Sequence, residues 1–177
     1  MICLEQIAKH SHDLANNIIK NQCLPAIFQY INKTENETRL RGILTLINIS
    51  FHDSSLAKTL IEEKCLPVIK NVLIKDKNLL VQSACCQCLY EIAKHGNDFV
   101  NPIIDENFSM LLILIKQGKG EELQKAEAIL KKLIEFSLNI DFLQDIFLNG
   151  PRSLYSPVLI QISRVIQSNS KAKKYSK

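Results

Sequence analysis

Cysteine is the residue type whose spacing in this chain first suggests chemistry. Three of the six cysteines lie close together, at Cys85, Cys86 and Cys88, and clustered thiols can hold zinc or react in redox chemistry. On a helix, however, successive side chains point about 100° apart, so a C-C-x-C run surrounds a tetrahedral ion poorly. Free cysteine packs as a small apolar side chain. We therefore expect these cysteines in the core, with neither a metal nor a disulfide.

The histidines also have a spacing that suggests chemistry, because His10, His52 and His95 recur at intervals of 42 and 43 residues. Histidine often acts as a general acid or base, but no carboxylate pair, nucleophile turn or phosphate-binding loop accompanies these three. Gly118-Lys119-Gly120 lacks the rest of a P-loop and predicts only a turn between helices. A histidine at a helix end can donate to the last carbonyl groups. We expect that capping role, and we expect no enzyme and no cofactor.

The histidine spacing belongs to a repeat that covers most of the chain. Residues 3–27 and 45–69 align at a shift of 42 residues, a third copy follows 43 residues later at 88–112, and a weaker fourth starts near Leu130. A period of this length is typical of HEAT and armadillo arrays. The identities between the first two copies include Leu4 and Leu46, Ile7 and Ile49, and Pro25 and Pro67.

Each copy divides into three predicted helices. A long helix ends in a Leu-x-x-Ile pair, a short helix follows at about 55–63, and Asp53 with the serines after it can cap that helix. Pro67 is expected at the first position of the next helix, which runs to about Lys75, because its missing N–H costs nothing there. Three helices per repeat favour armadillo over two-helix HEAT repeats. The residues expected between neighbouring repeats are Leu46, Ile49, Leu89 and Ile92.

The predicted fold is all-α, an armadillo-type α-solenoid in which three-helix repeats form a right-handed superhelix. We place the array at residues 1–168, followed by a basic tail at 169–177. The segments of the array are a partial repeat at 1–11, repeats at about 12–53, 54–96 and 97–138, and a divergent end at 139–168.

The charge of the chain is unevenly distributed. The net charge is +4, and the tail holds four lysines and no acid, which leaves 18 basic and 18 acidic residues in the body. A neutral body argues against nucleic-acid binding, which needs clustered positive charge. No apolar run reaches the length of a membrane span and no signal peptide opens the chain, so we expect a soluble intracellular protein without a membrane partner. The tail is expected to be a solvated end, to be weakly attracted to an acidic surface, or to be the start of a further helix.

Several stretches resemble armadillo proteins. Residues 42–50 and 85–93 resemble the third helix of an armadillo repeat, while Cys23-Leu24-Pro25 and Cys65-Leu66-Pro67 resemble the start of the second. Nearly the whole chain is similar to the C-terminal half of the sperm-associated antigen six family, armadillo proteins of the ciliary central apparatus. The stretches that carry this are Ile7-Ala8-Lys9-His10 with Asp13-Leu14-Ala15, Thr38-Arg39-Leu40-Arg41-Gly42-Ile43, Glu91-Ile92-Ala93-Lys94-His95, and Gln161-Ile162-Ser163-Arg164-Val165 with Ser170-Lys171-Ala172-Lys173-Lys174.

The family resemblance implies a protein-binding scaffold in the axoneme, part of the cytoskeleton of a cilium or flagellum. It would bind central-apparatus proteins or microtubules and support beating. Two other functions fit the same repeat pattern: a cytoplasmic armadillo adaptor with another client, and a regulatory subunit that docks on an enzyme.

The resemblance also implies where a partner would bind. Third helices of peptide-binding armadillo proteins line a concave groove, where a Trp and an Asn four residues later form a ladder along an extended peptide. Here only Asn48 fits, which disfavours a site of the nuclear-import type for basic peptides. A groove for another surface and a merely solvated face both stay open. The Trp places hold Ile2, Leu44, Gln87 and Ala128, and the Asn places hold Gln6, Asn48, Glu91 and Lys132. The candidate groove residues are Leu44, Asn48, Gln87, Glu91 and Lys132.

The N-terminal end carries a further expectation. The chain opens inside a third helix, so the first two helices of that repeat are absent, and we expect a fragment, a truncated gene model or a degenerate paralogue of a longer repeat protein. Solenoids need terminal repeats with a polar outer face. We therefore expect residues 1–11 to fray, or the chain to self-associate through this end.

Overall fold

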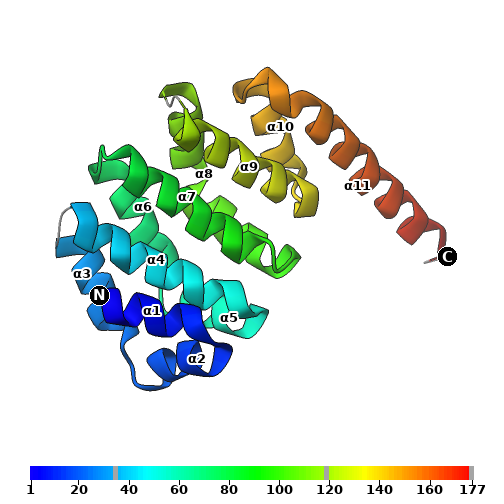
Figure 1. The fold of residues 1–177 in the computed structure, drawn as a ribbon. Coiled ribbons are helices and arrows are strands. Elements are labelled where there is room, and N and C mark those ends of the chain that lie inside the picture. The colour runs from blue at the N-terminus through cyan, green and yellow to red at the C-terminus, as the bar shows by residue number, and fades with distance from the viewer. Residues whose placement is uncertain (34–35, 118–119, 176–177) are drawn as a thin grey trace.

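The computed structural model describes residues 1–33, 36–117 and 120–175. Within these ranges the chain is helical, with one short 3₁₀ segment and no strand. Figure 1 shows α1, α4, α7 and α9 following one another as one layer, with α3, α6 and α8 behind it, and neighbouring helices of each layer are in contact. No described helix combines the length and apolarity that a membrane span requires.

The helices follow the predicted repeat. The first layer element is α1 (Ile2–His10), and the next helices are α2 (His12–Lys20), α3 (Leu24–Lys33) and α4 (Asn36–His52). They are followed by α5 (Ser54–Glu62), α6 (Cys65–Lys75) and α7 (Leu79–Ala93), then by α8 (Asn97–Gln117) and α9 (Glu121–Phe136). The last elements are α10 (Ile140–Asn149), the 3₁₀ segment η1 (Arg152–Leu154) and α11 (Tyr155–Tyr175), which lies against α10 and α9.

Short polar side chains begin the helices at the sharp junctions between them. Asp53 Oδ1 accepts from the Leu56 N–H at 2.8 Å and so caps α5 as predicted, although α5 begins one residue earlier than expected. Ser11, Asn78 and Asn139 cap α2, α7 and α10 in the same way. Each cap satisfies an N–H that has no partner inside its own helix.

Pro67 does not open its helix as predicted, because α6 begins two residues earlier, at Cys65. Lys64 makes the break between α5 and α6 by adopting the left-handed conformation, with φ 71°. Pro67 is therefore the third helical residue. Its missing N–H is still one of the first four, which have no intrahelical acceptor, so the helix tolerates it.

The prediction of three helices per repeat is wrong for residues 97–138, because α8 runs unbroken from Asn97 to Gln117 and even contains Pro102. In the two earlier copies the chain breaks at Gln22 and Lys64, both at positive φ. The aligned residue of the third copy is Asn107, inside α8. The Cys-Leu-Pro that follows the earlier breaks is replaced by 108–110, Phe-Ser-Met, so neither a left-handed residue nor a proline ends the helix.

The core lies between the helix layers, and the predicted inter-repeat residues are in it. Leu46, Ile49, Leu89 and Ile92 are fully buried, as predicted. Cys85, Cys86 and Cys88 are also buried, which confirms their core placement, and all six cysteines are free thiols. Burial raises the pKa of the Cys88 thiol to about 12 and raises those of Cys65 and Cys85 well above their ordinary value. These thiols therefore stay protonated and unreactive at neutral pH.

At the N-terminus, helix α1 is only partly covered by the rest of the array. Helix α1 buries Ala8 and most of Glu5 against α4, yet leaves Ile2 and Ile7 exposed. Fraying or self-association at this end stays a prediction, which hydrogen exchange on residues 1–11 and light scattering across a concentration series would test. The basic tail at 169–177 lies largely outside the described residues: the backbone of α11 continues to Tyr175, and nothing is described of the tail's side chains.

Candidate functional site

The candidate groove residues all lie on the layer formed by α4, α7 and α9. Leu44 and Asn48 come from α4, Gln87 and Glu91 from α7, and Lys132 from α9. Glu91 is buried, with 8% of its surface exposed, and the other four are half-buried. The four Asn places, Gln6 included, therefore fall at one register on four successive helices of the layer.

The polar side chains among the candidate groove residues already have partners within the chain. Asn48 Nδ2 donates to the backbone carbonyl of Glu5 in α1 at 3.4 Å. Gln87 Nε2 donates to Glu91 Oε1 at 2.7 Å, which links those two candidates directly. Lys132 Nζ lies 2.9 Å from Glu135 Oε2 and 4.6 Å from the centre of the Phe136 ring. The Asn48 amide thus binds the neighbouring helix, whereas in the expected ladder it would bind a peptide.

One helical turn away on the same face, sequence reasoning missed Phe51 and Lys94. Phe51 is 60% exposed, and Lys94 Nζ lies 4.2 Å from the centre of its ring. The same ammonium group forms an ion pair with Glu91. A cation over an aromatic face is attracted by the ring quadrupole. Phe51 follows Asn48 by three residues and Lys94 follows Glu91 by three, so the helical period places both on the candidate face.

Arg41 is the other charged group that sequence reasoning missed on this layer. Its Nη1 lies 3.0 Å from Glu5 Oε2 in α1, and its Nη2 lies 3.5 Å from Glu37 in its own helix. The hydrogen bond and charge of Glu5 raise the pKa of the Arg41 guanidinium. The signal for this pair is weak in the sequence, because Arg41 and Glu5 are 36 positions apart.

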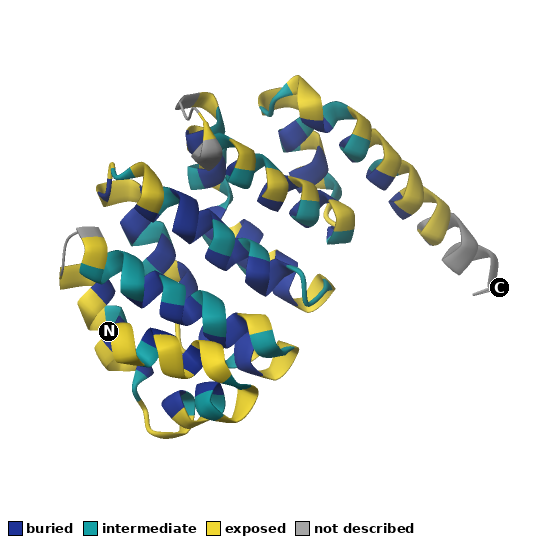
Figure 2. Cartoon of the chain, in the orientation of Figure 1, coloured by how far each residue is buried: buried dark blue, intermediate teal, exposed yellow. Residues whose placement is uncertain are grey.

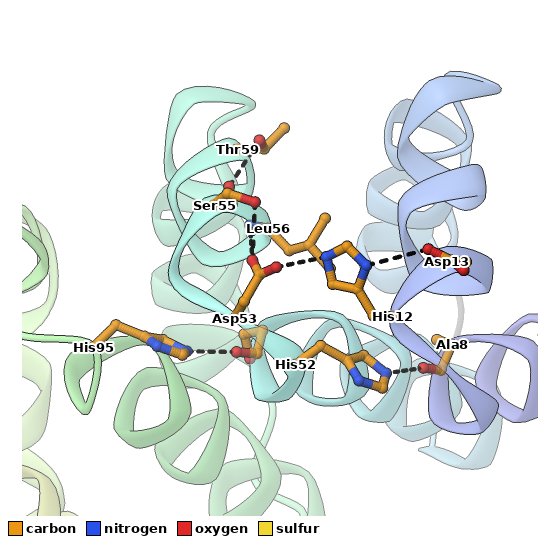
Figure 3. Close-up of polar contacts among 10 residues, drawn as sticks. Ala8, His12, Asp13, His52, Asp53, Ser55, Leu56, Thr59 and His95 are labelled. Carbon is orange, nitrogen blue, oxygen red and sulfur yellow. Dashed lines mark hydrogen bonds and ion pairs between the residues drawn. The ribbon is translucent and has the colours of Figure 1, made fainter.

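The recurring histidines connect repeats, which corrects the expectation that each caps its own helix. His52 Nε2 lies 2.7 Å from the carbonyl oxygen of Ala8 in α1, and His95 Nε2 lies 2.7 Å from that of Ser50 in α4 (Figure 3). Both acceptors lie in the last turn of the preceding third helix, where carbonyl groups have no partner in their own helix. His10, by contrast, is exposed on α1.

The histidine series stops at α9, where Phe136 takes the aligned place. The carbonyl that a histidine there would reach is that of Ala93, the residue aligned with Ala8 and Ser50. It already accepts from the backbone N–H of Gly96 at 3.2 Å. Gly96 has a φ of 120°, which few other residues adopt. The glycine turn after α7 therefore satisfies this carbonyl from within its own repeat, whereas the aligned carbonyls of Ala8 and Ser50 are met by a histidine of the next repeat.

A second polar contact joins the first helices of neighbouring repeats. His12 Nε2 of α2 lies 2.5 Å from Asp53 Oδ2, the other oxygen of the residue that caps α5 (Figure 3). The Leu56 N–H holds the pKa of the Asp53 carboxyl below its usual value, and Ser55 and His12 act in the same direction. These polar groups stabilise junctions between repeats. Among the described residues, no three histidine, cysteine or carboxylate side chains converge as a metal site would require.

Solved structures similar to this chain include engineered and designed repeat proteins. A designed armadillo repeat protein superimposes with a TM-score of 0.73 at 17% identity, over 96% of this chain and 78% of that one. Another designed armadillo repeat protein, in complex with the peptide (KR)4, gives a TM-score of 0.62 at 14% identity, over 90% and 89%. An engineered protein gives 0.70 at 15% identity over 92% of this chain, which spans only 42% of that protein's length.

At these identities the likeness establishes the fold alone. No protein-family model and no curated protein matches the sequence. None of the comparisons links the chain to the ciliary central-apparatus family that was expected from the sequence. The all-α architecture and the similarity to designed armadillo repeats together confirm the predicted fold class: this chain is an armadillo-type α-solenoid.

Proposed function

We propose that this chain is a non-catalytic scaffold that binds a segment of another protein along the layer formed by α1, α4, α7 and α9. The observation that carries the proposal is the continuity of this layer, in which third helices of successive repeats contact one another. An amide, a carboxylate and an ammonium group, those of Asn48, Glu91 and Lys132, occupy one register on three of the helices. Different groups at a fixed spacing suit recognition of an extended partner.

The contacts of the layer indicate how such a partner would bind. Glu91 and Lys132 already have oppositely charged partners, so a bound segment must exchange contacts with them, and these groups provide specificity more than affinity. Phe51 is the large apolar group exposed beside them, and it is the side chain from which we expect most of the affinity. The absence of the Trp ladder favours partners other than basic peptides.

Peptide display against the whole chain tests the proposal. Selected peptides should lose about tenfold or more in affinity for a variant carrying Phe51→Ala, Asn48→Ala and Lys132→Ala. The control carries Lys58→Ala, Glu62→Ala and Leu148→Ala, which change exposed residues of α5 and α10. Equal binding to both variants and to the unmodified chain, with matched circular dichroism, would show that this layer is not the binding surface.

We further propose that the scaffold belongs to the axonemal central apparatus of a cilium or flagellum, with central-apparatus proteins or microtubules as partners. The support is the resemblance of residues 38–43 and 161–174 to that family. The purified chain should be retained on demembranated axonemes at high salt, and the Phe51 triple variant should be released. Release of the unmodified chain at low salt would favour a cytoplasmic adaptor or a regulatory subunit instead.

A further inference from the structure

The turn between α6 and α7 exposes an unusual combination of side chains. We define the 74–80 corner as Ile74, Lys75, Lys77, Leu79 and Leu80, all exposed, with Asp76 and Asn78 between them (Figure 2). Ile74, Leu79 and Leu80 are 56%, 56% and 63% exposed. Single exposed aliphatic residues are ordinary, but three of them within seven residues of one turn indicate a candidate interaction site.

The corner is positively charged, because an arginine of α4 neutralises its one carboxylate, that of Asp76. Asp76 is buried and forms an ion pair with Arg39, which also donates through Nε to the Ile31 carbonyl at 2.9 Å. The other oxygen of Asp76 accepts from the Asn78 N–H at 2.9 Å. Lys75 and Lys77 therefore face solvent without a counter-charge from within the corner. Helix α7 adds to the positive potential of the corner, because the positive end of its dipole lies here and its first turn contains no acidic residue.

In the preceding repeat, polar residues stand at the places aligned with the three aliphatic residues, and two of them, Asn32 and Glu37, have polar partners. Asn32 stands where the later repeat has Ile74, and its Oδ1 accepts from Asn71 Nδ2 at 2.9 Å. Glu37 stands where the later repeat has Leu80, and it pairs with Arg41. The third apolar place, Leu79, aligns with Asn36. Solenoid stacking thus does not require apolar residues at these positions.

We propose that the 74–80 corner is a docking surface for an acidic segment of a partner protein that also carries leucine-like side chains. Leu79, Leu80 and Ile74 would cover its apolar side chains. Lys75, Lys77 and the start of α7 would face its carboxylates. This surface lies at the N-terminal end of α7. Leu80 precedes Gln87 by seven residues and Glu91 by eleven, which places it on the same side of α7 as the face proposed above, at the other end of the helix. An anionic lipid surface is the rival occupant and is decided by the test.

The probe is a fluorescent amphipathic peptide of leucine and glutamate, with a matched peptide that carries lysine in place of glutamate. We expect the acidic peptide to bind the whole chain, to bind several-fold more weakly in about 0.5 M salt, and to outcompete the basic peptide. The double variants Leu79→Ser/Leu80→Ser and Lys75→Glu/Lys77→Glu should each weaken binding about tenfold. A control with Leu148→Ser and Lys58→Glu makes one exchange of each kind at other exposed sites and should bind normally.

Three results would overturn the proposal. The first is equal affinity of the acidic peptide for the control and for both corner variants, with unchanged circular dichroism and melting. The second is equal binding of the acidic and basic peptides. The third is binding of phosphatidylserine vesicles that is lost in the same variants while the acidic peptide does not bind, which would assign the corner to a lipid surface.

Discussion

Repeats 54–96 and 97–138 have aligned sequences but different helices. In the first, Lys64 takes a left-handed conformation and separates α5 from α6. In the second, the aligned Asn107 lies within the continuous helix α8. Asn107 is fully buried, and neither its Nδ2 nor its Oδ1 finds a hydrogen-bond partner among the described residues. The helix of repeat 54–96 thus breaks at Lys64, which is exposed to solvent. The helix of repeat 97–138 continues through Asn107, whose buried amide has no partner in the described part of the chain.

The contrast shows which part of the repeat is indispensable. Both repeats keep the long third helix with its buried face, as in Leu89 of α7 and the aligned Leu130 of α9, each fully buried. The first and second helices can fuse because they need only cover that face. The stability of the array therefore depends on contacts between third helices more than on the number of helices per repeat.

Truncating the Leu89 side chain should give the largest loss of stability among the changes that test this comparison. Leu89→Ala leaves a cavity between α7 and its neighbours and should cost about 2–5 kcal/mol of unfolding free energy. Because α7 packs extensively on both α4 and α9 whereas α11 covers α9 less completely, Leu89→Ala should cost more than Leu130→Ala. Urea denaturation of both variants measures the difference. Unchanged stability in Leu89→Ala would show that the repeat register is wrong.

A proline exchange sharpens the comparison of the two second helices. Met110 aligns with Pro67 but lies deep in α8, where proline removes a hydrogen bond and clashes with the preceding turn. Met110→Pro should therefore cost about 3 kcal/mol, while Pro67→Ala, near the start of α6, should change stability by less than about 1 kcal/mol. Thermal unfolding followed by circular dichroism gives both values. A neutral Met110→Pro would mean that α8 breaks in solution as the earlier repeats do.

The helices and their buried faces could be predicted from the sequence because they depend on local spacing. Leu46 and Ile49 repeat at Leu89 and Ile92, and caps such as Asp53 act within three residues. The loss of the Cys-Leu-Pro at 108–110 indicates that α8 is continuous. The repeat period, in contrast, predicts a break at this place. The sequence period alone suggested three helices wherever the copy aligned.

Partners across repeats could not be predicted in the same way. Helical periodicity predicts that Asn48 and Glu91 share one face, but the contact of Asn48 with the Glu5 carbonyl depends on how α1 stacks on α4. The same holds for His95, whose acceptor is Ser50, 45 positions earlier. Helical periodicity gives the direction of a side chain, whereas the spacing and rotation of neighbouring helices decide what it touches.

Replacing the buried amide of α8 should stabilise the protein. Asn107→Leu keeps a similar volume and removes two polar atoms without partners, so it should raise the unfolding free energy by about 1–2 kcal/mol. The matched exchange Lys64→Leu, at the left-handed position of the earlier repeat, should not stabilise, because a branched apolar residue is poorly suited to positive φ and would be exposed there. Destabilisation by Asn107→Leu would show that the amide has a partner, such as an ordered water.

The smallest expected effect concerns the contact between third helices. His95→Phe gives the second repeat the residue that the third repeat has at Phe136 and leaves the Ser50 carbonyl without its donor at 2.7 Å. The loss should be about 0.5–1.5 kcal/mol, the usual net value of one hydrogen bond. Gly96→Ala is the matched change one repeat later, because it strains the positive φ from which the Gly96 N–H reaches Ala93. Hydrogen exchange should then show faster opening at the end of α4 in His95→Phe and at the end of α7 in Gly96→Ala. If His95→Phe leaves both stability and exchange unchanged, the histidine contact does not hold neighbouring repeats together, and packing between third helices alone sets their register.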